Sequence, residues 1–265
     1  MNVILRKPAL LTLVLAPVFF FSCFGLVLAQ ESASETTESQ EVKFTAADSF
    51  MLKGDYFPGQ DKAAGVITLH DCEHDRRSYT DLGLLLAENG LHTLAIDFRG
   101  YGESISEEFS LQQIKTKTKD IVAYQGELAR LNSYWDGDVL SAYHFLRSKV
   151  DRSKEVSVVA MGCSAIQAVA LAEKMRIGRF VMIAPKMGYV DKERFKNLFD
   201  IPVYFIASAH DIETYQTAKE LFEWNGDKRS KFQIFKGSRS GYSLLNGGRY
   251  LANDIAFWLK ANTGS

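Results

Sequence analysis

Histidine and cysteine are scarce in this chain, and their positions limit the chemistry that it can perform. Only 5 histidines occur among 265 residues, and none follows His210. Of the 3 cysteines, Cys23 lies in an apolar stretch at the amino terminus. The sequence has no cluster of histidines, cysteines and carboxylates at the spacing of a metal site. No metal or other cofactor is therefore predicted.

An excess of one charge is also absent. The chain has 31 basic and 32 acidic residues and a formal net charge of −1. This balance gives no electrostatic reason to expect nucleic acid or an anionic membrane surface as a partner. A composition of 46% hydrophobic and 24% charged residues is that of an ordinary globular domain.

A long apolar run occurs at the amino terminus. Arg6 and Lys7 precede apolar residues 9–28, and the small residue Ala29 follows them. This pattern is typical of a secretory signal peptide. The sequence predicts a signal peptide over residues 1–29 and an exported protein, either periplasmic or secreted. Retention as a membrane anchor is the alternative, because the run approaches the ~20 residues of a spanning helix.

The remaining chain divides into a short linker and one domain. Residues 30–40 are rich in Ser, Thr and Glu and have no apolar periodicity, which predicts a flexible tether. Residues 41–265 are predicted to form a single domain, long enough to bury a core without help from disulfides.

Short apolar runs typical of β-strands alternate with segments of helical periodicity. The predicted strands cover residues 42–45, 51–57, 66–69, 93–96, 156–160, 180–183, 203–206 and 232–235. The predicted helices cover residues 79–88, 135–150, 165–175, 214–224 and 250–261. This alternation predicts an α/β fold with a mostly parallel central sheet and helices on both faces. The first two strands are predicted to form an antiparallel hairpin.

Three motifs and the order of elements resemble those of the α/β-hydrolase family, which includes serine esterases, lipases and dienelactone hydrolases. The motifs are Leu69-His70-Asp71 followed by Arg77-Ser78-Tyr79, then Leu85, Ala87 and Gly90, and the run from Ala95 to Ser104. The resemblance covers most of the chain after residue 40. It implies the α/β-hydrolase fold and a site for small acyl esters at the carboxyl ends of the strands.

The turn after the fifth predicted strand resembles the nucleophile turn of that family. Ser164 is expected to present its hydroxyl above the sheet, with Gly162 as the small residue two positions before it. Ile166 stands where a second glycine is expected, and its branched side chain predicts a relaxed or reshaped turn. Cys163 is a poorer candidate for the nucleophile, because Met161 would then occupy the small-residue position.

The resemblance also implies an acid and a base for the serine. Asp211 follows the seventh predicted strand and is the expected acid, with capping of the next helix as its alternative role. The histidine is expected after the last strand, but Ser240 stands there, and a serine hydroxyl is not basic enough to replace imidazole. His210 and His74 lie in loops at the same sheet edge and are the two candidates for a substitute base.

An oxyanion hole is implied at the same place. The resemblance assigns it to the backbone N–H groups of Cys72 and Ala165. Asp71 stands where glycine is usual, and its carboxylate would disfavour a developing oxyanion. Cys72 and Cys163 are expected to approach each other, and a disulfide requires Cα atoms within about 7 Å. The sequence leaves that distance open.

Access to the site depends on two segments. Residues 185–200 are too short for a large lid. Residues 107–132 have helical spacing and are the candidate for a cover over the site from another side.

The missing histidine determines the functional prediction. The sequence predicts an exported α/β-hydrolase-like protein, non-catalytic or very weakly active, that acts as a binding or structural module with a small-molecule ligand. The first alternative is a serine esterase for small acyl esters that uses Ser164 with His210 or His74. The second alternative is a membrane-anchored interaction module. The ligand and the oligomeric state are not predicted.

Overall fold

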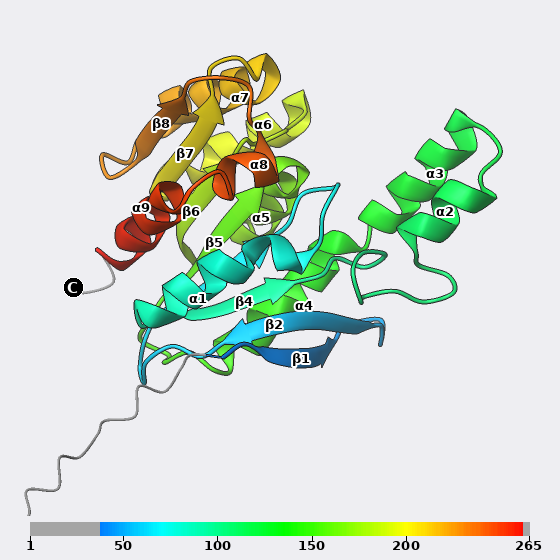
Figure 1. Ribbon diagram of the computed structural model, residues 1–265, viewed down its shortest axis with the longest axis horizontal. Helices are drawn as coiled ribbons and strands as arrows, with labels where there is room; N and C mark the ends of the chain where they lie inside the picture. Colours follow the sequence, from blue (N-terminus) through cyan, green and yellow to red (C-terminus); the bar gives the residue numbers. More distant parts are fainter. Residues whose placement is uncertain (1–37, 262–265) are drawn as a thin grey trace, which may run out of the picture. The chain divides into compact units, whose positions relative to one another are not determined.

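The computed structural model describes residues 38–261. Their strands form one sheet in the order β1-β2-β4-β3-β5-β6-β7-β8 (Figure 1). The strands are β1 (Gln40–Thr45), β2 (Met51–Phe57), β3 (Gly65–Leu69), β4 (His92–Ile96), β5 (Val156–Met161), β6 (Ile177–Ile183), β7 (Val203–Ser208) and β8 (Lys231–Phe235). The predicted signal peptide and residues 30–37 of the predicted tether lie outside the described residues.

The strand directions agree with the prediction. β1 pairs with β2 and β2 pairs with β4 in antiparallel fashion, whereas all other neighbouring strands are parallel. The mostly parallel sheet with an antiparallel opening hairpin is therefore confirmed. Because the carboxyl ends of the parallel strands meet at one edge, the loops after β3, β5, β6, β7 and β8 gather there.

Helices cover both faces of the sheet. They are α1 (Thr80–Glu88), α2 (Leu111–Lys117), α3 (Ile121–Asn132), α4 (Trp135–Arg147), α5 (Ala165–Ala172), α6 (Tyr189–Phe195), α7 (Ile212–Trp224), α8 (Gly241–Leu245) and α9 (Arg249–Lys260), with 3₁₀ turns η1 (Arg76–Tyr79), η2 (Gly162–Ser164) and η3 (Lys196–Leu198). α1, α8 and α9 pack on one face, and α4, α5, α6 and α7 pack on the other (Figure 1).

Successive side chains of a strand point to opposite faces of the sheet, so each buried strand contributes to the apolar core on both faces. In β5, Val158 and Ala160 belong to the apolar cluster under α4 and α5, whereas Val159 and Met161 belong to the cluster under α1 and α9. Every residue of β5 is buried. A strand that is buried on both faces needs a nearly continuous apolar run, which explains why its sequence predicts it so clearly.

The segment at residues 107–132 forms two helices rather than one. The Ser110 side chain caps α2 by accepting the N–H of Gln113, and the Asp120 side chain caps α3 by accepting the N–H of Ala123 at 2.8 Å. The second cap starts a new helix at Ile121, because it satisfies amide groups that a continuous helix would have bonded internally. The two helices project away from the sheet in Figure 1.

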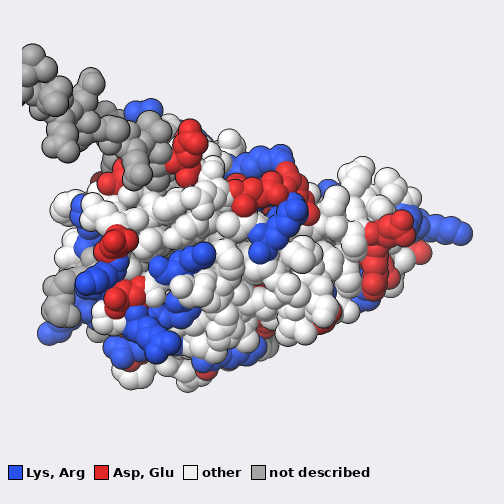
Figure 2. Space-filling model, turned by 90° about the horizontal axis from the view of Figure 1, so that it is seen from below, with Lys and Arg blue, Asp and Glu red and all other residues white. Residues whose placement is uncertain are grey.

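Acidic and basic side chains lie beside one another in several places on the face drawn in Figure 2. Within residues 38–261, acidic and basic side chains form several ion pairs, such as Arg194 with Glu173 at 2.7 Å. Exposed pairs of this kind contribute little to stability. Within residues 38–261, no helix has the length and apolar character that a membrane span requires.

Candidate active site

The turn after β5 places a glycine, not a serine, at its tip. β5 ends at Met161, and Gly162 follows with φ of +58°. This left-handed conformation is the one that glycine adopts without steric cost. In the strand-turn-helix arrangement of the α/β-hydrolases, the residue on the strained turn is the one exposed above the sheet.

Ser164 lies two residues further on, at the start of α5, and it is fully buried. Its Oγ accepts the N–H of Met161 at 3.0 Å and lies 2.8 Å from the carbonyl oxygen of Leu69 and 2.9 Å from that of Met161. The structure therefore does not present this hydroxyl above the sheet, contrary to the expectation from the sequence.

The structure differs from the expectation in the residue that occupies the tip of the turn, which lies two positions before Ser164. With Gly162 at the tip, the residues two before and two after it are Ala160 and Ser164, and both are small, as this turn requires. Ile166 lies beyond that position and is only half-buried. The crowding that the sequence predicted from Ile166 therefore does not arise.

The expected oxyanion amides are only partly available. The N–H of Ala165 donates to the carbonyl oxygens of Gly162 and Cys163, so it is occupied within the turn. By contrast, the backbone N–H of Cys72 makes no backbone hydrogen bond among residues 38–261. Of the two expected amides, that of Cys72 is therefore the one available in this structure.

A cavity of about 260 Å³ opens at this sheet edge. It is lined by Asp71, Cys72, Glu73, His74, Gly162, Cys163, Lys186, Ser240, Gly241, Tyr242 and Ser243. The residues predicted as catalytic or oxyanion groups are divided: Cys72, His74 and the histidine position Ser240 line it, whereas Ser164, Ala165, His210 and Asp211 do not. Asp71, Gly162 and Cys163, which the sequence analysis also discussed, line it as well. No residue of α2 or α3 lines it either, so the cover expected from residues 107–132 is not found.

His74 is held by a carboxylate at the cavity wall. Its Nδ1 lies 2.7 Å from Oδ1 of Asp71, and its ring stacks on Tyr242 with centroids 4.7 Å apart. The same Asp71 oxygen accepts the backbone N–H groups of Glu73 at 2.9 Å and His74 at 3.0 Å. A carboxylate bonded to Nδ1 keeps a proton there and leaves Nε2 as the basic nitrogen.

Asp211 and His210 lie at the end of β7. Asp211 is the first residue before α7 but makes no capping hydrogen bond, and its Oδ2 is buried without a hydrogen-bond partner in the described part of the chain. His210 is exposed, and its backbone N–H donates to Gly237 at 2.9 Å. The Ser208 hydroxyl also donates to the carbonyl oxygen of Arg239. The structure thus brings the Asp211 loop beside the loop that leads to Ser240.

A disulfide joins Cys72 to Cys163, whose Cα atoms are 6.0 Å apart. This is within the limit that the sequence left open. Both residues are half-buried, and both line the cavity. The bond connects the loop after β3 to the turn after β5.

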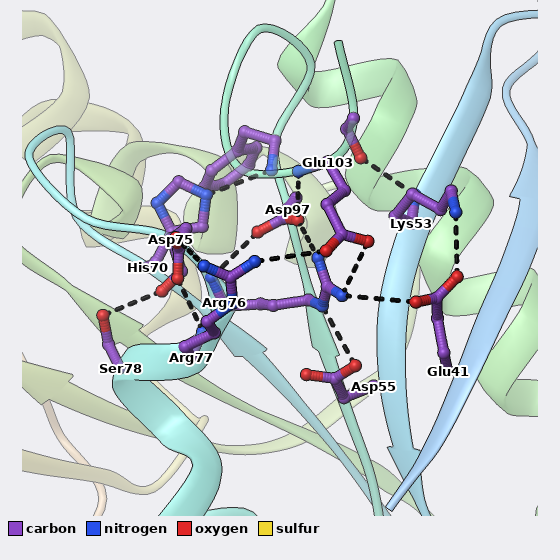
Figure 3. Close-up of polar contacts among 12 residues, drawn as sticks. Glu41, Lys53, Asp55, His70, Asp75, Arg76, Arg77, Ser78, Asp97 and Glu103 are labelled. Carbon is purple, nitrogen blue, oxygen red and sulfur yellow. Dashed lines mark hydrogen bonds and ion pairs between the residues drawn. The ribbon is translucent and has the colours of Figure 1, made fainter.

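The loop that carries Asp71, Cys72 and His74 is anchored by Arg76 (Figure 3). The Arg76 side chain is only 4% exposed and forms an ion pair with Asp97, which is fully buried. Its Nε lies 3.0 Å from Asp55 and its Nη2 lies 3.2 Å from Glu103. The hydrogen bond from Arg76 lowers the pKa of Glu103. These contacts attach the loop to β2 and to the segment after β4.

His70 supports the same loop from inside the core. It is fully buried, its Nδ1 donates to the carbonyl oxygen of Asp71 at 2.6 Å, and its Nε2 accepts the N–H of Phe98 at 3.1 Å. Burial lowers the pKa of His70. Both ring nitrogens are occupied, which is the arrangement of a neutral structural histidine.

Lys186 and Tyr242 were not predicted from the sequence. Lys186 follows β6, and its backbone N–H donates to the carbonyl oxygen of Gly162 at 3.0 Å. Tyr242 belongs to the first turn of α8. Neither lies in a motif, so no sequence signal marks them. No group of three or more metal-ligating side chains is found among residues 38–261.

No known protein family matches this sequence, and no curated protein does so either. Solved structures do match the fold. An esterase of Pyrococcus furiosus, Pf2001, is 19% identical with a TM-score of 0.60, over 86% of this chain and 94% of that one. A dienelactone hydrolase of Anabaena variabilis is 14% identical with a TM-score of 0.60, over 85% and 96%. A cold-adapted esterase from an Arctic intertidal metagenomic library is 15% identical with a TM-score of 0.62, over 89% and 98%. The chain therefore has the α/β-hydrolase fold.

Proposed function

We propose that this chain is an exported α/β-hydrolase-fold protein that binds a small molecule in the cavity of about 260 Å³ and does not hydrolyse esters through a serine nucleophile. One observation carries the proposal: Gly162 occupies the tip of the turn, and Ser164 is buried below it. A glycine has no group that can attack an acyl carbon. The missing histidine at Ser240 removes the usual base as well.

The lining of the cavity supports a small polar ligand. Lys186, His74, Ser240 and Tyr242 supply side chains that donate or accept hydrogen bonds, and the Cys72–Cys163 disulfide supplies an apolar wall. The volume is slightly below the usual range of about 300–1,000 Å³ for ligand pockets, which favours a small ligand over a long acyl chain. Esterases and a dienelactone hydrolase share the fold, so small esters and their carboxylic acids are the first ligands to test.

Export rests on the apolar amino-terminal stretch and is supported by the disulfide, because disulfides persist mainly in oxidising compartments. The mass of the protein recovered after expression distinguishes the two readings of that stretch. A chain that begins at Gln30 agrees with cleavage after Ala29. A full-length chain in the membrane fraction would favour the membrane-anchored module instead.

The test of the main proposal is hydrolysis of short p-nitrophenyl esters, together with labelling by a fluorophosphonate, which reacts with activated serines. The full chain is compared with its Ser164→Ala and His210→Ala variants. We expect no labelling and no turnover above the rate in buffer for any of them. Turnover that disappears in Ser164→Ala, with the protein folded, would overturn the proposal.

One observation favours a second function, a weak esterase that uses no serine. Asp71 orients His74 at the cavity wall, so Nε2 of His74 is placed to activate a water molecule. In that case turnover persists in Ser164→Ala and His210→Ala and disappears in His74→Ala. The same series of variants therefore separates both functions from the serine esterase.

A further inference from the structure

We propose that the Cys72–Cys163 disulfide is a thiol–disulfide exchange site that reacts with a small organic thiol in the cavity. This inference goes beyond ligand binding, because it assigns a covalent reaction to the bond. It does not depend on whether the protein hydrolyses esters.

The position of the bond is the first argument. Both cysteines line the cavity of about 260 Å³, and both are half-buried rather than enclosed in the core. Reaction at a disulfide requires that an attacking thiolate can reach one of its sulfur atoms. The bond therefore lies where the fold exposes a reactive group to its ligands.

The two sulfur atoms differ in their surroundings, which is the second argument. Cys163 lies in the turn that leads into α5, where backbone N–H groups at a helix start stabilise a thiolate. Lys186 is held beside this turn by the hydrogen bond from its backbone N–H to Gly162, and it lines the same cavity. Cys72 lies instead in the loop between Asp71 and Glu73. Cys163 is therefore the better leaving group, and Cys72 is the sulfur that is attacked.

The other charged groups around the cavity do not cancel this difference. The Asp71 carboxylate already accepts two backbone N–H groups and Nδ1 of His74. Glu73 and Lys186 are both exposed, so water and salt screen both charges, which are of opposite sign. The start of α5 therefore decides the difference in favour of a thiolate on Cys163.

The reaction proceeds in balanced steps. The thiolate of the small thiol attacks Sγ of Cys72, the bond between Cys72 and Cys163 breaks, and Cys163 leaves as a thiolate. The product is a mixed disulfide between the thiol and Cys72. A second thiolate then attacks the sulfur of the bound thiol and releases the small disulfide, and Cys72 takes up a proton. The Cys163 thiolate takes up the second proton, so that two small thiols are oxidised to one disulfide while the protein disulfide is reduced to two thiols.

The first test measures the pKa of each thiol in the full chain. Both variants also carry Cys23→Ser. Cys72→Ser then leaves Cys163 as the one thiol, Cys163→Ser leaves Cys72, and the rate of alkylation by iodoacetamide against pH gives each thiolate population. We expect a pKa below about 7.5 for Cys163 and near the ordinary value of about 8.5 for Cys72. Equal values for the two thiols would overturn the asymmetry. Thermal unfolding of both variants establishes that they are folded.

The second test uses the oxidised full chain with its own cysteines. It is treated with reduced glutathione, quenched with an alkylating agent and weighed by mass spectrometry. We expect a mixed disulfide on Cys72 and a rate several-fold above that of the same chain unfolded in urea. Lys186→Gln slows the reaction, whereas Lys228→Gln, at an exposed lysine outside the cavity, does not. A folded disulfide that reacts no faster than the unfolded one is a structural bond, and the proposal would then be wrong.

Discussion

The hydroxyl of Ser164 lies 2.8 Å from the carbonyl oxygen of Leu69, so it joins the turn after β5 to the end of β3. The same Oγ accepts the N–H of Met161 at 3.0 Å. A hydroxyl that is buried and bonded on both sides is part of the framework under the cavity. It is not available to attack a ligand within that cavity.

Ser164→Ala is therefore expected to lower stability rather than activity. The substitution leaves the buried N–H of Met161 without its acceptor, which costs about 1–3 kcal/mol. Urea unfolding measures the loss. Ser148→Ala is the matched control, because that hydroxyl is exposed and, within residues 38–261, bonds only to the carbonyl oxygen of Phe145. Its effect is expected within about 0.5 kcal/mol. Equal effects of the two substitutions would contradict the structural role of Ser164.

The register of the turn predicts how a serine hydrolase site could be restored. Gly162→Ser places a hydroxyl at the tip, and Ser240→His supplies a base in the loop beside Asp211. The double variant is expected to react with a fluorophosphonate, whereas Gly162→Ser alone and Ser240→His alone are not, because nucleophile and base act together. Labelling followed by mass spectrometry locates the modified residue.

The Ser240→His single variant and one further variant make this prediction specific. Ser240→His alone tests whether Ser164 reacts once a histidine is present, and no labelling is expected. Adding Asp211→Asn to the double variant should reduce its labelling, since the acid orients the histidine. The strained conformation of residue 162 costs about 1–3 kcal/mol in stability for a serine. Labelling at Ser164 in any variant would show that the assigned register is wrong.

The sequence predicted the sheet well because its strands are short apolar runs buried on both faces, as in β5. It did not predict the register of the turn. The nucleophile turn requires small residues two positions before and two positions after its tip, and Ala160 and Ser164 meet this requirement around Gly162. A glycine has no nucleophilic group, however, so the sequence did not suggest Gly162 as the tip. The positive φ of Gly162, which decides the register, is not visible in the sequence.

The cavity lining was predicted only in part, because it depends on loops from distant segments. Lys186 follows the end of β6, and Tyr242 lies at the start of α8. Both line the cavity, and neither lies in a recognisable motif. The sequence predicted that Cys72 and Cys163 approach each other and could form a disulfide if their Cα atoms were within about 7 Å. Their Cα separation of 6.0 Å meets this condition. The helical periodicity of residues 107–132 was real, but periodicity does not tell where a helix packs.

Stability is expected to fall as the pH is lowered below about 6.5, in part because of His70. Burial lowers the pKa of His70, against the opposing effect of Asp97 and Asp71. As the pH falls, His70 therefore binds a proton in the unfolded chain before it does so in the folded chain. The stabilisation from neutral His70 is fully present above its pKa in the unfolded chain and is lost as the pH falls toward its pKa in the folded chain. The expected loss for one histidine is about 1.4 kcal/mol per pH unit.

Urea unfolding at about pH 7.5, 6.5 and 5.5 measures this slope, and the difference between the natural chain and His70→Gln isolates the histidine. His144→Gln is the control, because His144 is exposed on α4. The His144 variant is expected to keep the slope of the natural chain. A slope that is unchanged in His70→Gln would contradict a neutral, buried His70.

The ion pair of Arg76 with Asp97 is expected to dominate the stability of the loop that carries Cys72 and His74. The carboxylate of Asp97 is fully buried and also accepts the backbone N–H groups of Arg76 at 2.9 Å and Glu103 at 2.8 Å. Asp97→Ala removes all of these bonds and leaves the buried guanidinium of Arg76 with weaker partners. The free energy of unfolding is therefore expected to fall by about 3–5 kcal/mol. Glu103→Ala removes an exposed partner of the same arginine, and its effect is expected to be much smaller because solvent screens that charge. Urea unfolding of the two variants tests the order, and a larger loss in Glu103→Ala would show that the buried pair is not the anchor of this loop.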